Sequence, residues 1–261
     1  MASLAGLGKT TAIKPVKVEH PAPTYEGSDV KRIKLTYGPF KLRAGNGGKR
    51  EGNSISLDPQ GTGWRYVAAD FPTDITILSA GMSIRLANGD PISNANGVYN
   101  HHAFVSDVSK TVSSYLQCAG TKKNIPALNS ISGSAADAGI PKPAGAKTTT
   151  TTTLSKRVTG NYIAKNHKIL LQGDLVNYNN ATKEVYMVED VQYVEGKATG
   201  LMEIASHLVS ATQCEPGSGG YLGSVMVKAP KNQKKFTIKG SGIEIKDDGK
   251  ILMLRGHMHG E

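Results

Sequence analysis

Short runs in which apolar and polar residues alternate dominate the chain. In the clearest run, over 185–194, one face of a strand would carry Val185, Met187, Glu189 and Val191, and the other Tyr186, Val188, Asp190 and Gln192. A repeat of two residues is the period of a half-buried strand. Similar runs recur along the chain between Gly, Asn and Pro turn signals, and no amphipathic pattern longer than about 12 residues predicts a helix. The pattern predicts an all-β fold, an antiparallel β-sandwich of jelly-roll type.

Several strands can be placed individually. Ile169 to Val176 and Val185 to Val194 are predicted to be neighbouring strands, because Asn179-Asn180 between them is a turn signal. Ile33 to Leu42 is predicted to be a strand interrupted by Gly38-Pro39. Val98 to Val105 is a further extended stretch.

Composition predicts three parts along the chain. Residues 1–24 are polar and basic and are expected to form a flexible arm. Residues 25–198 are expected to form a first β-sandwich domain, with a long loop over 119–147 where Ala, Gly, Ser, Pro and Lys predominate. Residues 199–261 continue the pattern of short strands after a Gly-containing connection over 196–200.

The formal net charge of +10 indicates an anionic partner. The lysines and arginines are scattered, however, and the densest group, over 228–239, contains no interleaved aromatic residues and no nucleic-acid-binding motif. We therefore expect basic loops that bind an anionic or polysaccharide partner, and no nucleic acid. No stretch approaches the ~20 apolar residues of a membrane span. The start of the chain has no signal-peptide pattern, which predicts a cytoplasmic protein if the sequence is complete.

Two groups of histidines are candidate metal ligands. On one strand, His257 and His259 would share a face about 7 Å apart, so both imidazoles could reach a single ion. His101 and His102 are adjacent and would point to opposite faces of a regular strand. They can share an ion only at a bulge or a strand end, which Gly97 and Asn100 favour. The alternative for both groups is histidines with no ligand role.

Three short motifs give the histidines a context. They are Val-Tyr-Asn-His-His-Ala-Phe at 98–104, Leu-Gln-Gly-Asp-Leu-Val-Asn at 171–177 and Gly-His-Met-His at 256–259. In this order they resemble the copper type II, ascorbate-dependent monooxygenases, typified by the peptide-amidating hydroxylase. The resemblance is greater to the stress-up-regulated nodulin-like proteins of plants and fungi, and it extends over residues 30–261.

The resemblance implies two antiparallel β-sandwich domains, a copper ion in each, and an extracellular, secreted protein. The second domain would be partial here, because residues 199–261 number only about 60, near the lower limit for an independent core. In the family an adjacent histidine pair and a third histidine hold the copper that supplies an electron. A His-x-His pair and a methionine hold the copper at which oxygen and substrate meet. His101 and His102 match the first pair, and His257 and His259 match the second.

Two departures from the family pattern bear on activity. Asp174 stands where the family has the third histidine, which implies Asp174 as a ligand, and a carboxylate suits Cu(I) less well than an imidazole. The family's methionine ligand lies well beyond the His-x-His pair, and only two residues follow His259 here. We therefore expect a metal-binding protein, with copper as the metal, that has weak catalysis or none.

Two other functions stay open at this point. The chain would be an active copper monooxygenase if both coppers cycle between oxidation states with ascorbate. It would be a structural or interaction protein if the histidines are incidental and the basic loops carry its function.

Overall fold

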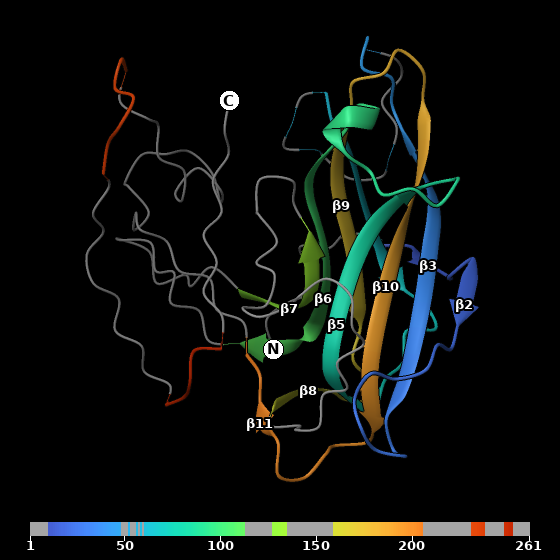
Figure 1. Cartoon of the computed structure of the whole chain (residues 1–261), viewed down its shortest axis with the longest axis vertical. Coiled ribbons are helices and arrows are strands. Elements are labelled where there is room, and N and C mark those ends of the chain that lie inside the picture. The colour runs from blue at the N-terminus through green and yellow to red at the C-terminus, as the bar shows by residue number, and fades with distance from the viewer. Residues whose placement is uncertain are drawn as a thin grey trace. The chain divides into compact units, whose positions relative to one another are not determined.

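Strands dominate the computed structural model, which describes residues 10–47, 52, 56, 58, 60–112, 127–134, 159–205, 231–237 and 248–252 (Figure 1). They form two sheets. The first has five strands in the order β1 (Ala12–Ile13), β4 (Thr62–Ala68), β9 (Ile169–Asn177), β6 (Val98–Val112) and β7 (Ala127–Ser134). The second has six in the order β11 (Met202–Glu203), β8 (Thr159–Ile163), β5 (Ile75–Leu86), β10 (Lys183–Glu195), β3 (Lys31–Leu42) and β2 (Lys17–Glu19).

The two sheets pack face to face, and the predicted β-sandwich is confirmed. The long strands pair antiparallel, whereas the short pairs β1–β4 and β11–β8 are parallel, so both sheets are mixed. One cluster of buried side chains joins the sheets and includes Leu35 of β3 and Leu171 of β9, both fully buried. The predicted alternation along β10 is confirmed, and Val185, Met187, Glu189 and Val191 form its inner face, since all four are fully buried.

A stacked aromatic pair connects the sheets at the centre of the core. The ring centroids of Phe40 on β3 and Trp64 on β4 lie 4.6 Å apart with their planes 10° from parallel. Trp64 lies opposite Gly173 of β9, where a Cβ atom would come within 2.0 Å of the indole ring. Glycine is therefore required at this position for the indole to lie flat on the neighbouring strand.

The predicted pairing of 169–176 with 185–194 is wrong. Both segments are strands, but β9 lies between β4 and β6 in one sheet, and β10 lies between β5 and β3 in the other. The chain crosses between the sheets after Asn177, whose side-chain amide donates to the carbonyls of Arg43 and Ala181. Asn179 donates to the carbonyl of Gly97. These asparagines therefore tie the crossover to distant loops and do not form a hairpin turn.

The predicted interruption at Gly38-Pro39 does not end the strand. β3 continues through these residues, and the register with β10 shifts between Val185 and Met187. Gly38 has a φ of 133°, a conformation that side chains with a Cβ rarely adopt. The glycine and proline thus form a β-bulge, which the sequence signal did not separate from a break.

Two segments expected to lack regular structure contain strands. Within the loop predicted over 119–147, residues 127–134 form β7 at the edge of the first sheet. Residues 10–24 are not a free arm, because β1 pairs with β4 and β2 pairs with β3. These short segments are ordered by pairing with a longer strand, which satisfies their backbone N–H and C=O groups.

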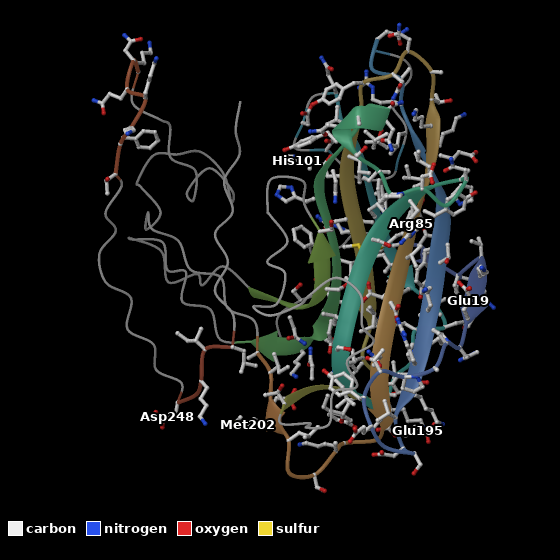
Figure 2. All side chains as sticks on the ribbon, viewed as in Figure 1. Glu19, Arg85, His101, Glu195, Met202 and Asp248 are labelled. Carbon is white, nitrogen blue, oxygen red and sulfur yellow. The ribbon has the colours of Figure 1, made fainter. Side chains whose placement is uncertain are left out.

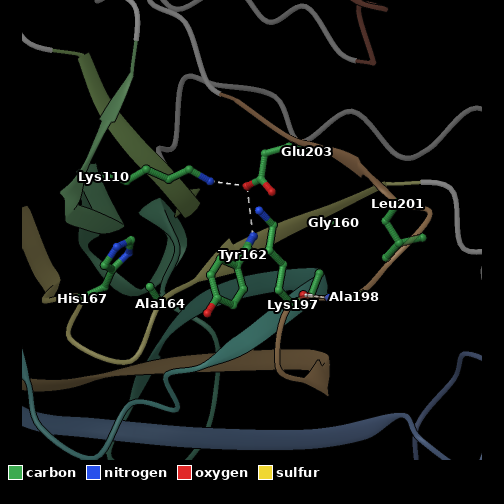
Figure 3. A pocket seen from close by; sticks show the side chains of 10 residues that line it. Lys110, Gly160, Tyr162, Ala164, His167, Lys197, Ala198, Leu201 and Glu203 are labelled. Atoms are coloured by element: carbon green, nitrogen blue, oxygen red, sulfur yellow. Dashed lines mark hydrogen bonds and ion pairs between the residues drawn. The ribbon is translucent and has the colours of Figure 1, made fainter.

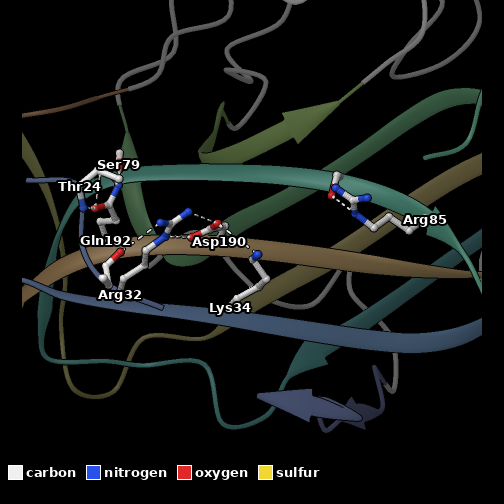
Figure 4. A network of polar contacts seen from close by, with 9 residues as sticks. Thr24, Arg32, Lys34, Ser79, Arg85, Asp190 and Gln192 are labelled. Atoms are coloured by element: carbon white, nitrogen blue, oxygen red, sulfur yellow. Dashed lines mark hydrogen bonds and ion pairs between the residues drawn. The ribbon is translucent and has the colours of Figure 1, made fainter. Parts of the chain in front are cut away.

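The outer face of the six-stranded sheet is polar and carries cross-strand ion pairs (Figure 4). Arg32 donates two hydrogen bonds to the carboxylate of Asp190, of 2.8 and 2.7 Å. Next to this pair, Gln192 donates to Thr24, in the segment before β3, and to Ser79 of β5. These contacts fix the register of β3, β10 and β5 on the face that does not contribute to the core.

The chain divides into two compact units. The sandwich unit contains the described residues up to Lys110 together with Ser130–Ile204, and the other unit contains the described parts of 111–129 and 205–254. The domain boundary predicted between residues 198 and 199 falls within the sandwich unit, since β11 (Met202–Glu203) pairs with β8. Among the described residues there is no helix with the length and apolar character needed to cross a bilayer.

Candidate functional site

The adjacent histidines His101 and His102 lie at a β-bulge in β6. Asn100 pairs with Leu175 of β9 and His102 pairs with Asp174, so His101 is the extra residue on its strand. The bulge removes the alternation that would send the two side chains to opposite faces. Their ring centroids lie 4.2 Å apart with the planes inclined by 41°. The strand irregularity predicted from the sequence is therefore confirmed.

His101 (Figure 2) and His102 belong to a row of rings along β6. Ala103 and Val105, which follow the pair on β6, are fully buried in the core between the sheets. Alternation then puts His102 and Phe104 on the opposite face. The ring centroids of Tyr99 and His101 are 6.0 Å apart, and those of His102 and Phe104 are 5.6 Å apart. The histidines therefore have an aromatic neighbour at each end.

Asp174 links this pair to the centre of the sheet. It lies on β9, between Gly63 of β4 and His102 of β6. Its Oδ2 atom is 3.2 Å from Nδ1 of His101, and both side chains are only 9% exposed. The expected proximity of Asp174 to the histidine pair is confirmed.

Ser56 holds the other oxygen of Asp174. The Ser56 hydroxyl donates to Oδ1 of Asp174 and accepts the backbone N–H of Asp58 at 3.1 Å. Gly61 closes this turn, and a Cβ atom there would come within 2.1 Å of the Ser56 oxygen and 2.8 Å of Oδ1. The glycine thus leaves the space in which serine and aspartate meet.

This geometry determines which nitrogen of His101 carries the proton. An ionised carboxylate only accepts hydrogen bonds, so Nδ1 of His101 donates to Asp174. In the neutral ring the lone pair is then on Nε2, the nitrogen that can bind a metal. A metal-ligating histidine usually donates a hydrogen bond from its other ring nitrogen, often to a carboxylate. Asp174 therefore has the geometry of a residue that orients an imidazole ligand.

The structure brings together three of the five metal ligands proposed from the sequence: His101, His102 and Asp174. His257 and His259 lie outside the described residues. Within the part of the chain that the structure describes, no group of three or more His, Cys, Asp or Glu side chains is arranged to hold an ion. The site at β6 and β9 consists of two imidazoles with an orienting carboxylate.

Sequence reasoning missed Ser56 and Gly61. The Asp58-Pro59-Gln60-Gly61 stretch does signal a turn, and the N–H of Gly61 donates to the carbonyl of Asp58. Nothing local indicates its partner, because Ser56 and Asp174 are 118 positions apart. The contact depends on the pairing of β4 with β9, which the spacing of residues does not reveal.

Comparison of the chain with protein-family models, curated proteins and solved structures finds no match.

Proposed function

We propose that this chain is a metal-binding β-sandwich protein that holds copper through His101 and His102, with weak catalysis or none. The observation that supports the proposal is the bulge in β6. It sets the two imidazoles side by side on one face, with Asp174 bonded to Nδ1 of His101.

The donor set fits copper better than a hard cation. Imidazole nitrogens are good ligands for copper, which has the highest affinity of the first-row divalent metals for such sites. His101 and His102 would hold the ion, and Asp174 would fix the orientation and tautomer of His101. Bound copper would supply a Lewis-acidic centre that can change oxidation state.

Two features favour binding over catalysis. Asp174 occupies the position of the third family histidine, and its Oδ2 atom is engaged by His101. A site with two imidazoles has one imidazole fewer than the three-histidine site of the copper monooxygenases, and imidazole suits Cu(I) better than a carboxylate does. We also propose that this chain is a secreted, stress-related protein with the architecture of the copper monooxygenases.

Copper titration of the untagged full chain by calorimetry tests the proposal. The set comprises the wild type, His101→Ala/His102→Ala, His257→Ala/His259→Ala, and His20→Ala as the control for an exposed histidine. We expect the first double variant to lose one equivalent of Cu(II) and the control to bind as the wild type does. If the His101→Ala/His102→Ala variant binds as much copper as the wild type, with unchanged affinity, the proposal is wrong.

A further inference from the structure

A second cluster of chemically active side chains lies at the far end of β6 from the histidine pair. A cavity of about 510 Å³ is lined there by β5, β8, β11, the end of β6, and the loops after β8 and β10 (Figure 3). Lys110 lines it, nine positions after His101 on the same strand. At ~3.4 Å per residue the two sites are about 30 Å apart, so the cavity is separate from the proposed metal site.

His167 is fixed in the wall of this cavity by a buried carboxylate. Oδ2 of Asp107 lies 2.6 Å from Nδ1 of His167, and Asp107 is fully buried. The other carboxylate oxygen accepts the backbone N–H groups of Ser109 and Lys110 at 2.9 and 3.2 Å. Asp107 is thus held by three partners, and His167, with its side chain 22% exposed, can present Nε2 as an acceptor.

The two lysines of the cavity wall have different partners. Lys110 forms an ion pair with Glu203 and donates to Asn161 at 2.9 Å, and the same Glu203 oxygen accepts the N–H of Tyr162 at 3.1 Å. The ammonium group of Lys197 lies 5.8 Å from the centre of the Tyr162 ring. Within the described ranges no carboxylate is at ion-pair distance from Lys197. Lys197 therefore lies over an aromatic ring and forms no ion pair within these ranges.

The rest of the wall is small and apolar. Ala164, Ala198 and Leu201 line it. Gly160 forms part of the floor, where a Cβ atom would come within 2.4 Å of the Thr76 methyl group. Small-molecule sites usually have volumes of about 300–1,000 Å³ and combine an apolar wall with a few fixed polar groups. The cavity has both properties.

We propose that this cavity binds a small hydroxylated organic acid of about the size of one sugar ring. Its carboxylate pairs with the ammonium group of Lys197, a hydroxyl group donates to Nε2 of His167, and its body lies against Ala198 and Leu201. The proposal does not depend on copper binding at His101 and His102.

Titration of the ¹⁵N-labelled full chain with D-glucuronate, followed by NMR, tests the proposal. Glucose carries the ring without the carboxylate, and acetate carries the carboxylate without the ring. We expect saturable shifts with glucuronate at the amides of Tyr162, Ala198 and Leu201, and unchanged amides at 100–102. Glucose and acetate should bind at least about tenfold more weakly, a difference of about 1.4 kcal/mol or more.

Variants assign the interaction to single groups. Lys197→Met should raise the Kd for glucuronate at least about tenfold, and His167→Asn should raise it by a smaller factor. Lys165→Met is the matched control, because Lys165 is exposed near the cavity but does not line it, and it should leave the Kd within about twofold.

Three results would overturn the proposal: no saturable shift of wild-type amides up to about 50 mM glucuronate, equal binding of acetate, or equal loss of affinity in Lys197→Met and Lys165→Met. The first two use the wild-type chain, so the test does not depend on how the variants fold.

Discussion

Nδ1 of His101 lies 3.2 Å from Oδ2 of Asp174, across the pairing of β6 with β9. The two residues are 73 positions apart in the chain. Their contact depends on the bulge at His101. In a regular strand the His101 side chain would lie on the opposite face, and the bulge places it on the face that carries Asp174. Through this contact Asp174 holds the His101 imidazole in one orientation.

Asp174→Asn should weaken copper binding without unfolding the protein. An amide can donate as well as accept, so it no longer specifies the Nδ1–H tautomer of His101. Loss of a partner of a ligating histidine typically lowers metal affinity by about 10–100-fold, and we expect a decrease in this range. Calorimetric titration with Cu(II) measures it. An affinity within about twofold of wild type would show that Asp174 does not support the imidazole.

Gly61→Ala should destabilise the protein through the Ser56–Asp174 contact. The added methyl group would come within 2.1 Å of the Ser56 oxygen, which must rotate away and leave the buried carboxylate with one donor fewer. Loss of a hydrogen bond to a buried polar group costs about 1–3 kcal/mol of unfolding free energy. Urea denaturation of the variant gives this value.

Gly81→Ala is the matched control for this substitution. Gly81 lies in β5, and a Cβ atom there would have no neighbour within 4 Å. The substitution should leave stability unchanged or raise it by about 0.4–1 kcal/mol, because alanine restricts the unfolded chain. Equal destabilisation by both substitutions would mean that the loss at Gly61 is not due to Ser56 and Asp174.

The sequence predicted the class of fold and the irregularity at the histidine pair, because both depend on local signals. Alternation from Val185 to Val191 requires one buried face, and adjacent histidines after Gly97 and Asn100 favour a bulge. The proximity of Asp174 to the histidine pair was predicted from the order of three short motifs, and the pairing of β6 with β9 explains it.

Pairing partners could not be predicted in the same way. Asn179-Asn180 is a turn signal whether the chain folds back within one sheet or crosses to the other. The choice is made by contacts of Asn177 and Asn179 with the loops at 43 and 97, which are distant in sequence. The cavity at Lys110 was missed for the same reason, since its lining comes from separate strands and loops with no common motif.

Glu189 should make the stability of the protein depend on pH. It is fully buried on β10, where burial raises its pKa from 4.5 to about 8, even though Ser132 donates to it at 2.7 Å. The unfolded chain releases this proton near pH 4.5 and the folded protein retains it up to about pH 8. The contribution to stability is therefore complete below pH 4.5 and is lost as the pH rises through 8.

Glu189→Gln isolates this effect. Near pH 5 the unfolding free energies of variant and wild type should be similar, because both side chains are neutral in the fold. At pH 9 the variant should be the more stable protein, by roughly 1.4 kcal/mol for each pKa unit of the shift. Urea denaturation at the two pH values gives the comparison. A difference that stays constant between pH 5 and 9 would show that Glu189 is not protonated in the folded protein.

The copper-loaded chain should not consume oxygen in a substrate-dependent way with ascorbate. A site of two imidazoles next to a carboxylate offers few of the soft ligands that stabilise Cu(I). An oxygen electrode with a panel of peptides and small aromatic compounds measures turnover. Substrate-dependent uptake that disappears in His257→Ala would establish the active monooxygenase as the correct function.

The pair His101 and His102 is proposed to hold one copper ion. Electron spin echo envelope modulation reports the remote nitrogens of coordinated imidazoles, and the sample for this measurement is the His257→Ala/His259→Ala variant loaded with one equivalent of Cu(II). We expect two coordinated imidazoles, reduced to one when either His101→Ala or His102→Ala is added. A spectrum that keeps two imidazoles after both substitutions, or shows none before them, would mean that this pair does not hold the ion.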